Sequence, residues 1–159
     1  MPLRSGSCSS LSTDFSARPT SATPLRRISN VRLKEEIDRI PTYYSERDGG
    51  FWVVVNGDTV VGTFGLERAS DDAMELRRMY VDPSARRRGI ARQMLQFAED
   101  ECRRRNVSRL ELSTAEIQQA ALALYRNAGY RFVRDETVEG LSNKTVGSGI
   151  LRYYLEKTL

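Results

Sequence analysis

Residues 80–91 read YVDPSARRRGIA and join the end of an apolar run, a turn and three consecutive arginines. Over residues 90–102 apolar side chains recur every four positions, which predicts a helix packed on a sheet. Arg86, Arg87 and Arg88 therefore lie at the N-terminus of a predicted helix. The positive end of the helix dipole opposes cations there unless an anion lies between them, so the segment is expected to bind an anion.

Two small residues follow the arginines. Gly89 has no Cβ, so the backbone can approach a phosphate group closely, and Ala91 keeps the next helical turn narrow. Together they predict a cradle for a diphosphate. The alternative is that the three arginines are solvent-exposed and bind nothing. For three consecutive arginines without this spacing of small residues, that alternative would be favoured.

The spacing of these residues resembles the signature of the GCN5-related N-acetyltransferase (GNAT) superfamily. That signature is Arg or Gln, two residues, Gly, one residue and then Gly or Ala, placed after a strand and opening a helix. Arg86, Gly89 and Ala91 fill it in register. The resemblance implies that the backbone N–H groups of residues 87–91, that of Ile90 included, bind the diphosphate of acetyl-coenzyme A.

A second segment, residues 114–130, carries the other half of the resemblance. Members of the superfamily often show Asn, two residues, Ala, three residues and Tyr at this place, then an aromatic residue after Gly. Gln118 replaces the usual Asn, which keeps an amide on a longer side chain. The residues that match are Ala121, Tyr125, Gly129 and Tyr130.

Gln118 and Tyr125 are seven residues apart, two helical turns, so both side chains can point at one ligand. The resemblance implies that Tyr125 protonates the departing thiolate and that Gln118, with Thr114 beside it, binds the pantetheine arm. A phenol with a pKa of about 10 stays protonated at neutral pH, which suits a donor. The alternative for Tyr125 is a core tyrosine whose hydroxyl reaches the surface.

The attacking amine has to lose a proton, because an alkylammonium with a pKa of about 10.4 is almost wholly protonated near pH 7. The chain has no histidine, so the candidates are a carboxylate or a chain of waters. Glu75 is the best placed carboxylate, and the alternative is a half-exposed strand residue. The resemblance also implies that a backbone N–H near Met79, Tyr80 or Val81 polarises the thioester carbonyl.

The composition excludes several classes of protein. Without histidine, zinc hydrolases and Ser-His-Asp catalysis are excluded, and no metal is expected. Cys8 and Cys102 cannot make a disulfide framework, which fits a reducing, cytoplasmic setting. No apolar run approaches the roughly 20 residues of a membrane span. Nucleic acid is not expected as a partner, because the arginines lack interleaved aromatic residues.

The chain divides into a leader and one domain. Residues 1–24 are rich in Ser, Thr and Pro with few aliphatic residues, which predicts a disordered leader, and the alternative is an organellar transit peptide. Residues 25–159 are expected to form one N-acetyltransferase domain. It should open with a strand at residues 25–28 and a helix that ends at Pro41.

Strands are expected to follow in series. Residues 51–55 and 59–66 flank Asn56-Gly57, which predicts a hairpin with both turn residues at positive φ. A third antiparallel strand should cover residues 74–81, and a short strand should end at Ser113. Ser113 and Glu116 form a predicted capping box that opens a helix through Ala128. Two more strands, 130–134 and 150–156, close the chain.

These elements predict an α+β fold with α/β/α layers, in which helices flank a central sheet. The resemblance implies a mixed, mostly antiparallel sheet with acetyl-coenzyme A at the splay between its fourth and fifth strands. The expected function is acetyl transfer to the primary amine of a small molecule, or as a second choice of a protein or peptide, by direct attack in a ternary complex. The alternative is a catalytically silent module that binds acyl-coenzyme A and regulates, and a homodimer is left open.

Overall fold

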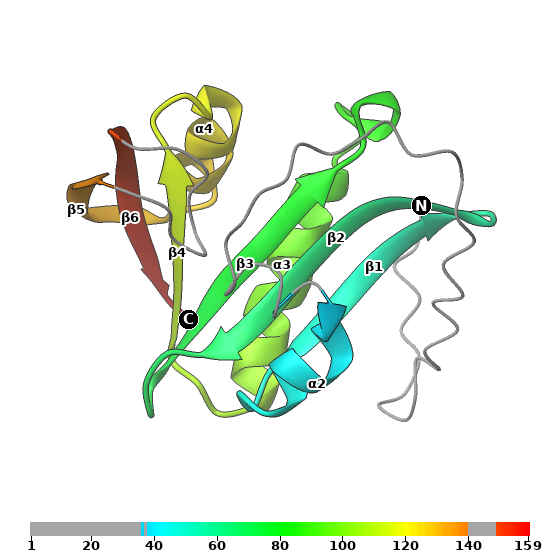
Figure 1. Ribbon diagram of the computed structural model, residues 1–159, viewed down its shortest axis with the longest axis horizontal. Coiled ribbons are helices and arrows are strands. Elements are labelled where there is room, and N and C mark those ends of the chain that lie inside the picture. Colours follow the sequence, from blue (N-terminus) through cyan, green and yellow to red (C-terminus); the bar gives the residue numbers. More distant parts are fainter. Residues whose placement is uncertain (1–35, 37, 140–148) are drawn as a thin grey trace.

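A computed structural model describes residue 36 and residues 38–139 and 149–159 of the chain (Figure 1). The predicted leader, residues 1–24, and the predicted strand at residues 25–28 lie outside the described residues. The described elements form a six-stranded sheet in the order β1-β2-β3-β4-β6-β5 with helices on both of its faces. The predicted layered α+β fold is therefore confirmed.

All neighbouring strands of the sheet are antiparallel except β3 and β4, which are parallel. This confirms the predicted mixed, mostly antiparallel sheet. The strands are β1 (Gly50–Asn56), β2 (Thr59–Arg68), β3 (Ala73–Val81), β4 (Arg109–Ala115), β5 (Arg131–Val138) and β6 (Ile150–Thr158). The helices are α2 (Ile40–Ser45), α3 (Ile90–Arg104), α4 (Gln119–Asn127) and the short 3-10 helix η1 (Pro83–Ala85).

Helices α2 and α3 cover opposite faces of the sheet (Figure 1). The apolar side of α3 faces the core, where Met94, Ala98 and Cys102 are fully buried. Burial raises the pKa of the Cys102 thiol to about 11, so this thiol is neutral. Cys102 is thus the buried core residue that the four-residue period predicts.

The β1–β2 hairpin differs from the expected one in its turn. Asn56 pairs with Thr59, so the two turn residues are Gly57 and Asp58, and of the three only Gly57 has a positive φ, of 61°. The prediction that Asn56 and Gly57 both have positive φ is therefore wrong. Asn56 completes the strand ladder, and a glycine at the first turn position suits a two-residue hairpin.

The helix predicted to end at Pro41 lies for the most part outside the described residues, and residues 36 and 38 are helical with a turn at Arg39. Pro41 itself lies in the first turn of the next helix, α2, where its missing N–H costs little because a first-turn N–H has no intrahelical acceptor. One predicted helix start is wrong. Ser113 does not cap α4, since it lies in β4 and pairs with Tyr154 of β6. The ladder with β6 keeps Ser113 extended, and the helix begins only at Gln119 and ends at Asn127.

Strands β3 and β4 diverge after a short parallel ladder, which runs from Ala73 opposite Arg109 to Leu76 opposite Leu112 (Figure 1). Just beyond it the register of β3 against β2 shifts, and Arg78 takes a left-handed conformation with φ of 52°. A bulge of this kind bends a strand and leaves one residue out of the ladder. It therefore opens a splay between β3 and β4, the fourth and fifth strands if residues 25–28 are counted as the first.

Candidate active site

A cleft of about 320 Å³ lies in the splay between β3 and β4. Residues from β3, β4, β6 and α4 meet there although they are far apart in the chain. The lining residues are Glu75, Leu76, Arg77, Arg78, Met79, Ser113, Thr114, Ala115, Ile117, Gln118, Ala121, Tyr125, Ile150 and Arg152. Five of the residues predicted from the sequence thus share one cleft: Glu75, Met79, Thr114, Gln118 and Tyr125.

Tyr125 reaches the cleft from α4 and is 7% exposed. Its hydroxyl donates to the Sδ atom of Met79 at 3.7 Å, so the phenol points at the bulged end of β3. Burial raises the pKa of Tyr125 to about 12, which keeps the phenol neutral across the physiological range. The edge of the splay therefore holds a neutral phenol, which is able to donate a hydrogen bond.

Gln118 holds the junction between β4 and α4. Its Oε1 atom accepts hydrogen bonds from the backbone N–H of Ala115, at 3.1 Å, and from the hydroxyl of Thr114, at 3.0 Å. These bonds fix the orientation of the side-chain amide at the wall of the cleft. The Nε2 group remains as the donor that a carbonyl of a ligand can use.

The three residues predicted to polarise the carbonyl lie at the end of β3. Met79 lines the cleft, whereas Tyr80 is 51% exposed and Val81 is outside the lining. The carbonyl of Val81 accepts a hydrogen bond from Nε of Arg86 at 3.1 Å. The bulge takes the Arg78–Met79 step out of register with β2, and the carbonyl of Arg78 there accepts a hydrogen bond from the hydroxyl of Thr63 at 3.1 Å.

The loop after β3 has the geometry of an anion cradle. We call residues 82–89 the phosphate loop. Arg87 and Gly89 both take left-handed conformations, with φ of 61° and 76°, and among the described residues other than the chain neighbours of Gly89 no heavy atom lies within 4 Å of where its Cβ would stand. Such alternating backbone geometry turns successive N–H groups towards one point.

The three arginines directly precede the N-cap of the helix at whose start they were predicted to lie. Helix α3 begins at Ile90, with Gly89 as its N-cap, and Arg86 is extended. The first turn of α3 contains no acidic residue, and no side chain caps it. Its free N–H groups and the positive end of the dipole therefore face the phosphate loop, which suits a diphosphate.

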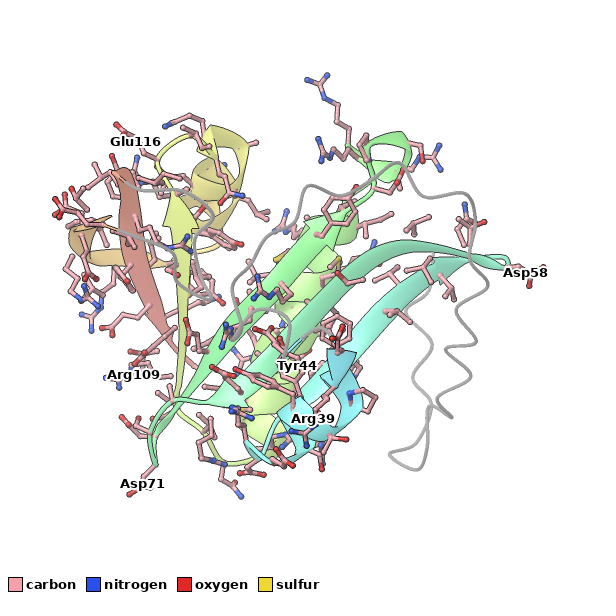
Figure 2. All side chains as sticks on the ribbon, viewed as in Figure 1. Arg39, Tyr44, Asp58, Asp71, Arg109 and Glu116 are labelled. Atoms are coloured by element: carbon pink, nitrogen blue, oxygen red, sulfur yellow. The ribbon has the colours of Figure 1, made fainter. Side chains whose placement is uncertain are left out.

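A buried charge cluster supports the bulge from the α2 side, and sequence reasoning missed it. Glu36 is 1% exposed and accepts two hydrogen bonds from Arg78, both of 2.8 Å, and one from Arg77 of 3.1 Å. Tyr44, which Figure 2 shows beside β2, donates to the same carboxylate at 2.8 Å. Burial alone would raise the pKa of Glu36, but these hydrogen bonds and the two positive charges outweigh it and lower the pKa.

Arg152 is a second residue of the cleft that sequence reasoning missed. It lies on β6, is 8% exposed, and donates through Nη2 to the hydroxyl of Ser113 at 3.0 Å. Burial chiefly lowers the pKa of its guanidinium, while the charges of Tyr154 and Glu75 raise it. No local pattern marks Arg152, because its neighbours in space come from strands that precede it by tens of residues.

The described residues contain neither a cluster of metal ligands nor a helix that could span a membrane. Over residues 38–139 and 149–159 no group of three or more acidic or cysteine side chains could hold a metal ion. None of the helices described here is long and apolar enough to cross a membrane.

The sequence and the fold are similar to known acetyltransferases. Residues 16–130 match the model of the acetyltransferase (GNAT) family. Human N-acetyltransferase 8 is 36% identical over 103 residues, which cover 59% of this chain and 44% of that protein. N-acetylaspartate synthetase of Danio rerio is 35% identical over 119 residues, which cover 69% and 41%. The chain thus spans less than half the length of these two relatives.

Solved structures share the fold at lower identity. A GNAT acetyltransferase of Staphylococcus aureus superimposes with a TM-score of 0.66 at 23% identity, covering 81% of this chain and 79% of that one. A GNAT acetyltransferase of Elizabethkingia anophelis, solved with acetyl-CoA bound, gives 0.64 at 18% identity and covers 89% and 95%. At 18–23% identity, these superpositions show a shared fold and nothing about the substrate.

Proposed function

Because the chain belongs to the acetyltransferase (GNAT) family, we propose that it transfers the acetyl group of acetyl-coenzyme A to the primary amine of a small molecule. The observation that carries the proposal is the neutral phenol of Tyr125 at the splay of β3 and β4. The phosphate loop follows directly from the strand that forms one wall of this splay. A nucleotide held at the loop can therefore extend its thioester along β3.

The chain supplies a donor for each part of the coenzyme. The backbone N–H groups of residues 87–91 bind the diphosphate, Nε2 of Gln118 donates to the pantetheine arm, and the bulged step at Met79 donates to the thioester carbonyl. Donors fixed by a strand need little reorganisation as negative charge develops on the carbonyl oxygen. These are the roles that the resemblance implies for residues 87–91, Gln118 and Met79.

The reaction is a direct attack in a ternary complex. The amine nitrogen forms a bond to the carbonyl carbon, the tetrahedral intermediate collapses, and the carbon–sulfur bond breaks. The Tyr125 hydroxyl donates to the sulfur as charge develops on it, in place of its contact with Met79. The proton of the ammonium passes to Glu75, directly or through water.

A small acceptor is preferred to a protein amine. The Danio rerio relative is named for the synthesis of N-acetylaspartate, which contains a small amine acceptor, and it is 35% identical. Two solved structures that are named as acetyltransferases of ribosomal-protein alanine, from Brucella melitensis and Escherichia coli, are only 22% and 21% identical to this chain. The cleft of about 320 Å³ also lies near the lower end of the range for small-molecule sites, about 300–1,000 Å³.

Calorimetric titration with acetyl-coenzyme A, followed by a thiol-release assay over a panel of primary amines, tests the proposal. We expect saturable binding at micromolar concentration, a rise in the unfolding temperature, and thiol release with at least one small amine. Binding without thiol release for any amine would favour the silent regulatory module. No binding at millimolar concentration would overturn the acetyltransferase assignment.

A further inference from the structure

The peptide unit that joins Arg78 to Met79 forms part of the cleft wall, and a residue of the neighbouring strand holds it from behind. Both Arg78 and Met79 line the cleft. The carbonyl of Arg78 accepts a hydrogen bond from the hydroxyl of Thr63 at 3.1 Å. Thr63 belongs to β2 and lies outside the cleft lining, so it contacts the cleft wall through the backbone of that wall.

The bond to Thr63 fixes the direction in which the N–H of Met79 points. Neighbouring strands lie about 4.8 Å apart, so a carbonyl of β3 comes within 3.1 Å of a β2 side chain only if it is turned toward β2. The C=O and N–H of a trans peptide point in opposite directions. The N–H of Met79 therefore points away from β2, toward the side of β3 on which β4 diverges and the cleft lies (Figure 1).

The bulge is held at a second point. Arg78 has a left-handed conformation, with φ of 52°, and its side chain donates two hydrogen bonds of 2.8 Å to the carboxylate of Glu36. The carbonyl and the guanidinium of one residue are thus held from two elements, which limits rotation of the peptide plane between Arg78 and Met79. Glu36 accepts hydrogen bonds from two further residues, so a change at Thr63, confined to one hydroxyl, is the sharper probe.

We propose that Thr63 is a positioning residue, whose hydroxyl directs the N–H of Met79 at the thioester oxygen of acetyl-coenzyme A. The inference rests on the proposed acetyl transfer and adds to it a residue outside the cleft lining. Negative charge develops on this oxygen as the amine attacks, and a donor already aimed at it stabilises the transition state without reorganisation. A hydrogen bond weakens as its angle departs from linearity, so a rotation of the peptide lowers the rate.

An infrared measurement tests the direction of the donor without any acceptor. Acetyl-coenzyme A with a heavy carbon isotope at its thioester carbonyl is bound to the protein, to Thr63→Val and to Thr63→Ser. A hydrogen bond to a carbonyl weakens the C=O bond and lowers its stretching frequency, which a loss of stability alone would not do. We expect a lowered frequency in the protein and in Thr63→Ser, which keeps the hydroxyl. In Thr63→Val the frequency should return toward that of free acetyl-coenzyme A.

Kinetics with an amine that releases thiol give the second readout. Thr63→Val should lower kcat about tenfold, a part of the roughly 100- to 1,000-fold loss known when a whole oxyanion donor is removed. The KM for the amine should change by less than about twofold, because the donor acts more strongly on the transition state than on the ground state. Thr63→Ser should restore most of kcat.

Thr59→Val is the matched control. Thr59 is an exposed residue at the hairpin end of the same strand, so this variant loses the same hydroxyl away from the bulge. It should leave the carbonyl frequency and kcat unchanged. The unfolding temperature shows whether each variant is folded, and Thr63→Ala, which also removes the donor, replaces Thr63→Val if that variant does not fold.

Three results would overturn the inference, and they separate it from the proposed function. If the carbonyl frequency is not lowered when acetyl-coenzyme A binds the protein, or is lowered equally in Thr63→Val, Thr63 aims no donor at this oxygen, while thiol release by the protein would still support acetyl transfer. If kcat falls equally in Thr63→Val and Thr63→Ser, Thr63 is a packing residue. If the frequencies follow the expected pattern and no amine releases thiol, the positioning is supported and acetyl transfer is wrong.

Discussion

The two ends of the cleft are built in different ways. The phosphate loop offers backbone N–H groups, held by left-handed conformations at Arg87 and Gly89, and its arginine side chains are exposed. At the splay, side chains carry the chemistry, and both Tyr125 and Arg152 are nearly buried. Substitutions in the phosphate loop should therefore change the affinity for acetyl-coenzyme A by altering the backbone conformation. Substitutions at the splay should change the rate or the choice of acceptor by removing individual side-chain groups.

The largest effect that this contrast predicts is a fall in kcat when a side chain at the splay is changed. Tyr125→Phe removes the donor to the leaving sulfur, so we expect kcat to fall about 100-fold, within the range known for general acids. The Kd for acetyl-coenzyme A should change by less than about twofold, because the diphosphate contacts lie elsewhere. Assays of thiol release measure kcat, and calorimetry measures the Kd for acetyl-coenzyme A.

A neighbouring tyrosine provides the control. The ring centre of Tyr130 lies 6.0 Å from that of Tyr125, and its hydroxyl donates to buried Glu99 at 3.2 Å. Tyr130→Phe should lower the unfolding temperature and leave kcat unchanged.

The pH profile checks the same assignment. The phenol of Tyr125 stays protonated until pH approaches its pKa of about 12, so the rate should rise with pH as the amine is deprotonated and should show no descent below pH 11. A descent near pH 10 that disappears in Tyr125→Phe would contradict the raised pKa.

An intermediate effect is expected in the backbone of the phosphate loop. Gly89→Val places a β-branched residue at φ of 76°, where left-handed geometry costs about 1–2 kcal/mol even for an ordinary residue. The free loop should relax, and binding has to restore its shape, so the Kd for acetyl-coenzyme A should rise about tenfold. Gly89→Asn is the control, because Asn tolerates this conformation better and should raise Kd by less than about threefold. Equal Kd values for the two variants in calorimetry would contradict the backbone role.

The smallest effect is expected for the exposed charges of the loop. Arg88→Ala should raise the Kd for acetyl-coenzyme A about threefold at low salt, and the difference should shrink above about 0.5 M salt because exposed charges are screened. Arg39→Ala makes the same change of charge at the N-cap of α2, at a distance from the loop (Figure 2), and should have no effect on Kd. A loss of more than about 30-fold for Arg88→Ala would show that the side chain, and not the backbone, binds the phosphates.

The contrast also explains which parts of the site the sequence could predict. The phosphate loop and the pair Gln118 and Tyr125 each depend on residues within one local segment, so spacing alone indicates them. Arg152 reaches the cleft, and Glu36 contacts the bulge at Arg78, only through contacts between residues about 40 positions apart. A single sequence contains no periodicity that reports such contacts.

Local signals were outweighed where strand pairing competed with them. Ser113 and Glu116 have the spacing of a capping box, yet Ser113 pairs with Tyr154 in the sheet. Asn56 and Gly57 mark the hairpin, but the ladder takes Asn56 and moves the turn by one residue. The bulge at Arg78 was not predicted, because a left-handed arginine is disfavoured by local propensity and is stabilised here by two hydrogen bonds to Glu36.

Those two hydrogen bonds set a limit on how far the protein can be trimmed. A truncation that begins at α2 would discard Glu36 and leave the guanidinium of Arg77 with one carboxylate instead of two, and that of Arg78 without its buried counter-ion. Removing one partner of a buried ion pair costs about 3–5 kcal/mol, which is a large share of the stability of a small domain. Shortened versions made for crystallisation should therefore start before Glu36, and one that starts after it would be expected to lose the shape of the splay along with its stability.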